Sequence, residues 1–274
     1  MEKQSQMSNF DIEKVSSVDA ELTEQYGNLA LIYHSYLMLE APHQLSKKVF
    51  DYLTGRGLDA NDLIPMYGVG YCPSPYNSMY ERVTFPYLDV NGNCVTIVGR
   101  VLPGEEGNID DGRPRYWHYA FHKNQHLWNL FHLIDHDPKI TWCIVTEGIF
   151  DVLGLQAAGI YNAVATLGAT FSPIQATLLH RYFDNFLFAF DNDGAGNRAT
   201  MKALSLCRQL GYKSFGIAWP PQWKDAGEAG ATNPSDLHDL VRDSILGGED
   251  LEERYQGTRL LNIVKALHRA GGHA

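Results

Sequence analysis

Short apolar runs alternate with helix-like segments in the second half of the chain. The runs cover residues 143–146, 163–166, 186–190 and 215–219, and they are rich in Val, Ile, Phe and Ala. Runs of this length and composition are typical of buried parallel strands, and the intervening segments suit covering helices. The alternation predicts an α/β domain over residues 136–247, with a parallel sheet flanked by helices.

The first half of the chain follows a different pattern. Apolar residues recur at helical spacing between residues 18 and 39 and again between residues 45 and 53. Two β-rich runs then flank Asn91-Gly92, which is a strong signal for a hairpin. We therefore predict a mixed helical and β-hairpin subdomain over residues 17–135, which makes the whole chain α+β.

Two of the apolar runs in the second half end abruptly in acids. Glu147 follows one run, with Asp151 a helical turn later, and Asp191 and Asp193 follow another. The carboxyl ends of parallel strands meet at the edge of the sheet where ligands bind, so we expect these acids to gather there. Gathered carboxylates repel one another, and a hard divalent cation is the usual counter-charge. The pattern predicts a Mg²⁺ site in which Mn²⁺ can substitute.

Each acidic segment by itself also has a purely structural interpretation. Glu147 could cap the helix that follows it, and Asp-Asn-Asp-Gly, residues 191–194, could form an ordinary polar turn. The occurrence of both segments at strand ends favours the metal site.

A basic segment with interleaved aromatic residues lies in the first half of the chain. Charge can hold a nucleic-acid backbone while aromatic faces stack on bases, so the segment suits a groove for single-stranded template and triphosphates. Acidic residues nearby leave open a mixed-charge hairpin surface without a binding role. The cations are Arg82, Arg100, Arg113, Arg115 and Lys123, and the aromatic residues lie within 116–119.

Composition restricts the class of protein. The 274 residues are 45% hydrophobic, which supports a folded core, and no apolar run approaches the length of a membrane span. Without a signal-peptide pattern either, we expect a cytoplasmic protein. The 4 cysteines are scattered, so no zinc site is expected, and a net charge of −10 argues against a surface coated with nucleic acid. Residues 1–16 are polar and expected to be loosely ordered, and residues 248–274 are expected to form a closing helix.

The acids also carry a family resemblance. Glu147-Gly-x-x-Asp151 followed by Asp191-x-Asp193-x-Ala-Gly resembles the Toprim domain that is shared by DnaG-type primases, topoisomerases and certain nucleases. The segments 82–86, 99–102, 113–117 and 121–123 are similar to the basic subdomain of DnaG-type primases. On these motifs the chain is identified as a DnaG-type primase catalytic core, of the short phage or mobile-element kind.

The resemblance implies template-directed synthesis of short RNA primers from ribonucleoside triphosphates on single-stranded DNA. It assigns catalysis to Glu147, Asp191 and Asp193 and binding of nucleic acid or nucleotide to the cations named above. Arg115 stands where the family often has lysine, which puts the detail of that contact in doubt. The acid that completes the metal site is left open between Asp225 and Asp236. With Asp225 the metal set is Glu147, Asp151, Asp191, Asp193 and Asp225.

The resemblance also suggests partner proteins and alternative functions. Its zinc-binding and helicase-interacting domains are not recognised in the sequence, so we expect a replicative helicase or a zinc-bearing primase protein as partner, in the host cytoplasm if the chain is phage-encoded. A Toprim nuclease would use the same acids, but it needs no basic triphosphate groove. A primase-like subunit that only binds single strands is the non-catalytic alternative, and the intact set of acids argues against it.

Overall fold

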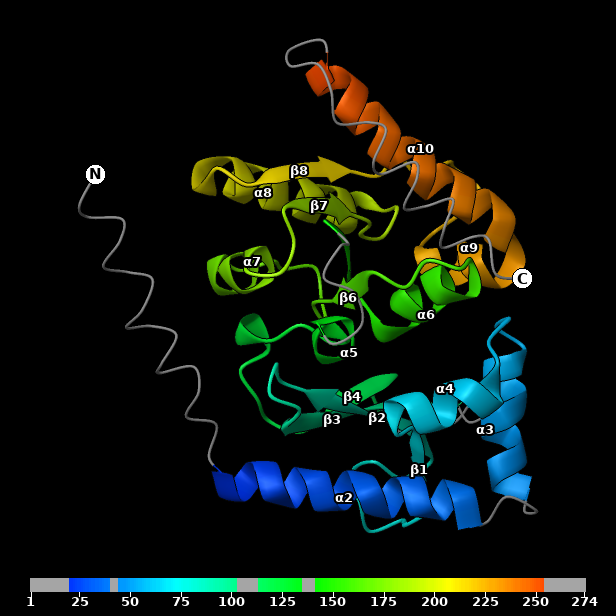
Figure 1. The fold of residues 1–274 in the computed structure, drawn as a ribbon. Helices are drawn as coiled ribbons and strands as arrows, with labels where there is room; N and C mark the ends of the chain where they lie inside the picture. Colours follow the sequence, from blue (N-terminus) through cyan, green and yellow to red (C-terminus); the bar gives the residue numbers. More distant parts are fainter. Residues whose placement is uncertain (1–19, 40–43, 103–112, 135–140, 254–274) are drawn as a thin grey trace. The chain divides into compact units, whose positions relative to one another are not determined.

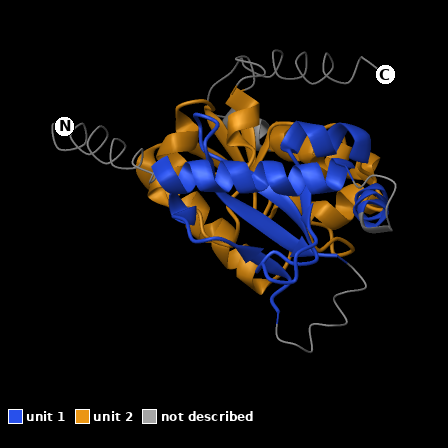
Figure 2. Cartoon of the chain, turned by 90° about the horizontal axis from the view of Figure 1, so that it is seen from below, with its two compact units in different colours: residues 1–54, 59–125 blue, residues 55–58, 126–274 orange. Residues whose placement is uncertain are grey.

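The structure is a computed structural model that describes residues 20–39, 44–102, 113–134 and 141–253 (Figure 1). The chain divides into two compact units, residues 1–54 with 59–125 and residues 55–58 with 126–274 (Figure 2). The predicted boundary at residue 135 and most of the predicted closing helix lie outside the described residues, as do residues 1–16. These domain limits stay predictions.

The first unit contains an antiparallel sheet with the strand order β1-β2-β3-β4. Strands β2 and β3 form the predicted hairpin, in which Phe85 pairs with Val98. Its loop is closed by Asp89, whose carboxylate accepts hydrogen bonds from the N–H groups of Asn91 and Asn93 at 2.8 and 2.9 Å. The elements are α2 (Ala20–Leu39), α3 (Gln44–Thr54), α4 (Ala60–Tyr67), β1 (Gly70–Cys72), β2 (Arg82–Leu88), β3 (Cys94–Val101), β4 (Tyr116–His118) and a 3₁₀ helix (Lys123–Gln125).

Helix α2 packs one face against this sheet. The helix is present as predicted, and Ala30, Tyr33 and Leu37 are its buried residues. Three apolar residues of the predicted face, Leu22, Ile32 and Tyr36, are exposed instead. The hydroxyl group of Tyr33 lies 3.1 Å from that of Tyr119, and the ring of Tyr119 stacks on Tyr26. The core of the first unit is therefore built between the long helix and the hairpin.

The second unit contains the predicted parallel sheet, with the strand order β6-β5-β7-β8 and flanking helices. The central strand β5 is buried along its whole length. Strand β8 covers Lys213–Gly216, so it begins and ends earlier than the predicted apolar run 215–219. The elements are α5 (Leu130–Ile134), β5 (Trp142–Thr146), α6 (Ile149–Ala157), β6 (Ala163–Ala165), α7 (Pro173–His180), β7 (Asn185–Phe188), α8 (Gly194–Leu210), β8 (Lys213–Gly216), α9 (Ala226–Thr232) and α10 (Pro234–Glu253).

Strand β7 and the residues after it complete the core of this unit. Phe186, Phe188 and Phe190 are fully buried, and Phe171 packs edge-on against the first two. Burial on both faces of the sheet explains why the run reads as continuously apolar instead of alternating. Within the described part of the chain, no helix has the length and hydropathy that a bilayer crossing requires.

Candidate metal centre

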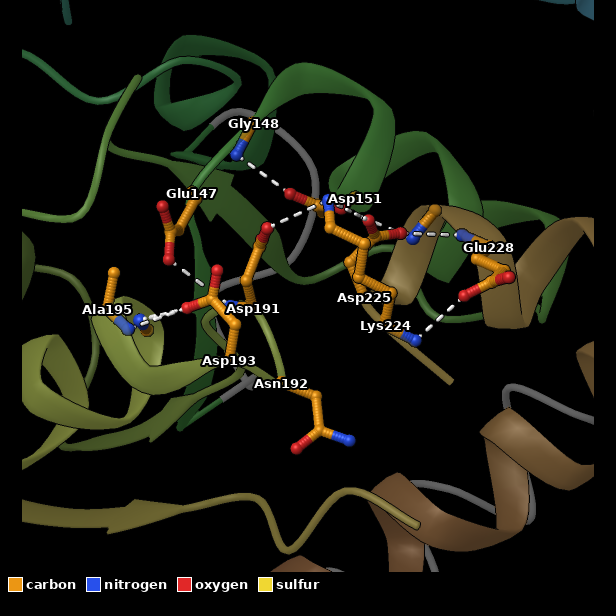
Figure 3. A network of polar contacts seen from close by, with 12 residues as sticks. Glu147, Gly148, Asp151, Asp191, Asn192, Asp193, Ala195, Lys224, Asp225 and Glu228 are labelled. Atoms are coloured by element: carbon orange, nitrogen blue, oxygen red, sulfur yellow. Dashed lines mark hydrogen bonds and ion pairs between the residues drawn. The ribbon is translucent and has the colours of Figure 1, made fainter. Parts of the chain in front are cut away.

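Three acidic segments meet at the carboxyl edge of the parallel sheet (Figure 3). Glu147 follows β5 directly, and Asp191 follows β7 after two buried residues. Strands β5 and β7 are neighbours, with Val145 paired to Phe188, so their ends lie together. Asp225 comes from the loop between β8 and α9. The predicted gathering of acids at this edge is therefore present.

The tightest group contains Asp151, Asp191 and Asp225. One carboxylate oxygen from each lies within 4.8 Å of the others. Asp151 is buried, and its two oxygens accept hydrogen bonds from the N–H groups of Gly148 at 2.8 Å and Gly227 at 3.2 Å. Asp151 is thereby held between the start of α6 and the start of α9, which carries Asp225.

Asp236, which the sequence offered in place of Asp225 as the acid completing the metal site, does not belong to this group. It is exposed in the first turn of α10, where its carboxylate accepts a hydrogen bond of 3.4 Å from the Asn233 side chain. Asp225 instead caps α9 by accepting the N–H of Glu228 at 2.7 Å. By position, Asp225 and not Asp236 belongs to the three-acid group.

Glu147 and Asp193 lie beside this group but are not among its three members. Figure 3 shows both on the other side of Asp191 from Asp151. Glu147 is half-buried, and its carboxylate accepts the N–H of Asp191 at 3.2 Å. The five acids expected as metal ligands are thus divided into a group of three and two neighbours.

Asp193 differs from the other acids in its surroundings. It is exposed and caps α8, where one oxygen accepts the N–H groups of Ala195 at 2.8 Å and Gly196 at 2.7 Å. These hydrogen bonds lower the pKa of Asp193. The local structural role of Asp193 is therefore to cap a helix, and its predicted role at the metal site stays a prediction.

Three of the other acids, Glu147, Asp151 and Asp191, have raised pKa values. Burial, followed by repulsion from Asp225 and Asp191, raises the pKa of Asp151 to about 8. Burial also raises the pKa of Glu147 and that of Asp191, each with added repulsion from neighbouring carboxylates. A concentration of oxygen ligands with excess negative charge matches what hard divalent cations prefer. The residues present therefore fit a site for a hard divalent cation.

Lys224 was not among the predicted site residues, yet it contacts two of the grouped acids. Its ammonium nitrogen lies 3.2 Å from Asp191 and 3.3 Å from Asp225. The adjacency of Lys224 to Asp225 was the available signal in the sequence. Asn192 was also missed, although it lies between two predicted acids and bonds to the loop that carries Asp225.

Close packing of α6 on α9 sets the distance between Asp151 and Asp225. A Cβ atom added at Gly154 of α6 would lie 2.2 Å from the carbonyl oxygen of Ala226, and one added at Gly230 of α9 would lie 2.1 Å from the carbonyl oxygen of Gly154. Glycine at both positions allows the helix backbones to touch. This contact holds α9, which Asp225 caps, against α6, which carries Asp151.

Two of the five predicted binding cations are buried in the first unit. Arg82 is 1% exposed, and its guanidinium group donates to the main-chain carbonyls of Pro114 at 2.6 Å and Arg115 at 2.9 Å. Arg100 donates to the hydroxyl groups of Tyr52 and Tyr116. Both arginines thus hold the sheet and its flanking segments together, contrary to the expectation that they line an open groove, and their contact with nucleic acid stays a prediction.

The other predicted cations are more accessible. Arg113 is partly exposed and pairs with Glu81 at 3.4 Å, while Arg115 and Lys123 are exposed. Strand β4 forms an edge of the antiparallel sheet, and its Trp117 is 39% exposed. A cationic and aromatic surface is therefore present around β4. The acidic positions 105, 106, 110 and 111 lie outside the described residues.

Comparison with known proteins points to one class. The Toprim-like family matches residues 144–229. A DNA primase from Pseudomonas putida is 31% identical over 199 residues, which cover 59% of this chain and 29% of that protein. A DNA primase from Legionella pneumophila is 28% identical over 252 residues, which cover 77% of this chain and 41% of that protein. The chain therefore spans less than half the length of these relatives.

A solved structure extends the similarity to the fold. The DnaG primase catalytic domain bound to single-stranded DNA superposes with a TM-score of 0.68 at 23% identity, over 81% of this chain and 78% of that one. The superposition covers far more of the chain than the Toprim-like segment. These relatives give no support to a phage or mobile-element origin.

Proposed function

We propose that this chain, which contains a Toprim-like domain within the fold of a DnaG-type primase catalytic core, is a DNA primase. It would join ribonucleoside triphosphates into short RNA primers on a single-stranded DNA template. The observation that supports this most directly is the three-acid group at the carboxyl edge of a parallel sheet, in a chain whose relatives are DNA primases.

In this proposal Asp151, Asp191 and Asp225 hold Mg²⁺, with Mn²⁺ as a substitute. Each offers one oxygen to a common point, and the backbone hydrogen bonds of Asp151 and Asp225 fix the direction of their carboxylates. When bound, a divalent cation neutralises triphosphate charge and lowers the pKa of the attacking hydroxyl group. The carboxylate of Asp193 is fixed in direction by the helix cap, and it would bind the cation from beside the three-acid group.

The chemical step joins the 3′-hydroxyl oxygen of the primer to the α-phosphorus of the incoming triphosphate. The new oxygen–phosphorus bond forms as the bond to the pyrophosphate oxygen breaks, and the hydroxyl proton must leave. We assign its removal to Glu147, because this half-buried carboxylate lies beside Asp191 and its raised pKa makes it a better base. No nucleophilic side chain is needed.

Template and triphosphate phosphates would be held by Arg113, Arg115 and Lys123, and a template base would stack on Trp117. Charge-based contacts of this type are independent of sequence. Arg82 and Arg100 would support the surface from beneath. A replicative helicase or a zinc-bearing primase protein remains the partner that we expect.

The test is incorporation of labelled ribonucleotides on a single-stranded template with Mg²⁺ or Mn²⁺, with recovery of intact template measured in parallel. We expect Asp191→Asn and Asp225→Asn to abolish incorporation, and Asp236→Asn, the matched exposed acid, to retain it. Loss of activity in the Asp236 variant alone would exchange the roles of the two acids. Degraded template without incorporation would establish a nuclease instead.

A further inference from the structure

We propose that Asn192 is a positioning residue of this centre, whose side-chain amide holds the loop between β8 and α9 so that Asp225 stays beside Asp191. The inference rests on the proposed metal-dependent function. Asn192 lies between Asp191 and Asp193 in the sequence, but Figure 3 shows its side chain pointing away from the carboxylates. It is therefore not a ligand candidate, and its effect must act through the loop.

The amide group of Asn192 makes two hydrogen bonds to that loop. Its Nδ2 atom donates to the carbonyl oxygen of Trp223 at 2.9 Å and to that of Pro220 at 3.2 Å. The main-chain N–H of the same residue donates to the carbonyl oxygen of Lys224 at 2.6 Å. One residue thus binds three carbonyl groups of the loop, and the last of them immediately precedes Asp225.

Other contacts place the start of this loop, whereas Asn192 acts at its end. The N–H of Ile217 donates to the carbonyl of Phe188 at 2.9 Å, and the indole N–H of Trp219 donates to the carbonyl of Phe190 at 2.7 Å. These bonds continue the β7–β8 pairing outward from the sheet. The hydrogen bonds of Asn192 lie further along the same two segments, the one after β7 and the one after β8. They connect the residue next to Asp191 with the residue next to Asp225.

The consequence is a defined separation between two carboxylates of the three-acid group. Asp191 precedes Asn192 by one peptide unit, and Asp225 follows Lys224 by one peptide unit. The Asn192–Lys224 main-chain bond, reinforced by the side-chain amide, therefore couples their positions. Groups that orient metal ligands without touching the metal typically change metal affinity by about 10- to 100-fold when removed.

Asparagine in this place could also serve only to form a turn, which is a common role for the residue. A residue that acts only in this way would lower stability without selectively altering metal affinity. The chain offers a matched control in Asn185, the first residue of β7, whose Nδ2 donates to the carbonyl of Thr141 at 3.4 Å. Asn185 has the same amide group, but it begins β7 and therefore lies at the end of that strand remote from the acids.

The experiment compares Asn192→Ala, Asn192→Asp and Asn185→Ala in the full chain. Mn²⁺ binding is measured by calorimetry, and hydrogen exchange is followed in a peptide covering residues 217–225. We expect Asn192→Ala to bind Mn²⁺ about tenfold more weakly, or worse, and to exchange faster in this peptide. In primer synthesis, the Mg²⁺ concentration for half-maximal rate should rise by a similar factor, while the rate recovers at saturating Mg²⁺.

Asn192→Asp keeps the shape of the side chain and guards against a failure of the alanine variant to fold. An added carboxylate would by itself attract the cation, so weaker Mn²⁺ binding in this variant can come only from displacement of the loop. Binding by Asn192→Ala that matches Asn185→Ala, or hydrogen exchange of the 217–225 peptide that is unchanged in both Asn192 variants, overturns the inference. Wild-type protein that neither binds Mn²⁺ nor makes primers contradicts the proposed function instead, and the exchange comparison still tests the loop contact.

Discussion

The ammonium group of Lys224 and a divalent cation are attracted by the same oxygens. Lys224 lies within 3.3 Å of two carboxylates in the three-acid group, and 63% of its side chain is exposed. We expect Lys224→Met to tighten Mn²⁺ binding by about two- to fivefold, because an exposed ion pair contributes at most about 1 kcal/mol. Calorimetric titration measures the change.

Lys202→Met is the control for this substitution, since Lys202 is exposed on α8. Binding by the control should equal that of the wild-type protein. If Lys224→Met bound Mn²⁺ more weakly, the lysine would support the cation site and would not compete with it.

Asp151 makes stability depend on pH. Its pKa of about 8 exceeds that of the unfolded chain, so between roughly pH 4 and pH 8 the folded protein binds the proton that the unfolded chain releases. Stability contributed by this group is therefore present at low pH and lost as the pH rises toward 8. In the presence of a chelator, we expect a lower melting temperature at pH 8.5 than at pH 6.

Asp151→Asn should remove most of this dependence, because asparagine does not titrate. Addition of Mg²⁺ to the wild-type protein should oppose the loss at high pH, since the cation stabilises the ionised carboxylate. An unchanged pH profile in the asparagine variant would assign the effect to other groups.

At the scale of elements, the contact of α6 with α9 joins packing to the site. We expect Gly154→Ala to destabilise the protein by about 1–3 kcal/mol, because the added methyl group would meet the backbone of α9. The same shift would move Asp225 and weaken metal binding. Chemical denaturation and Mn²⁺ titration measure the two effects.

Gly247→Ala provides the matched comparison on α10. A Cβ atom at Gly247 meets nothing within 4 Å, so alanine should stabilise this helix by about 0.5–1 kcal/mol. Destabilisation by both substitutions to the same extent would mean that the close approach of α6 and α9 is not the cause.

At the scale of the whole molecule, the proposed binding of nucleic acid would have to be local, because the net charge is −10. We expect Arg115→Ala and Lys123→Ala to weaken binding of single-stranded DNA, and each to reduce the slope of log affinity against log salt by about 0.7. Fluorescence anisotropy of a labelled oligonucleotide over a range of salt concentrations provides the measurement. Arg208→Ala, an exposed cation at the end of α8, should leave the slope unchanged.

Unchanged binding by Arg115→Ala and Lys123→Ala at low salt would restore the interpretation of a mixed-charge surface.

The buried arginines are not suitable for this test of nucleic-acid binding. Loss of Arg82 would leave two main-chain carbonyls without their donor, so its effect on binding cannot be separated from its effect on folding.

The sequence by itself determined the framework of this protein. Continuous apolar runs indicate strands that are buried on both faces, and Asn91-Gly92 indicates a tight hairpin, because both depend on residues close together in the chain. The acids that follow β5 and β7 could be placed at one edge because the carboxyl ends of parallel strands lie at the same edge of a sheet. The family resemblance rested on these local motifs as well.

Only the tertiary structure decided which distant groups meet. It placed Asp225 and not Asp236 beside Asp151, buried Arg82 and Arg100 against partners far away in the chain, and brought Asn192 to the β8–α9 loop. The spacing of apolar and polar residues records which side of an element is buried. It does not record which hydrogen-bond donor faces which acceptor across two elements, because that depends on how closely their backbones can pack.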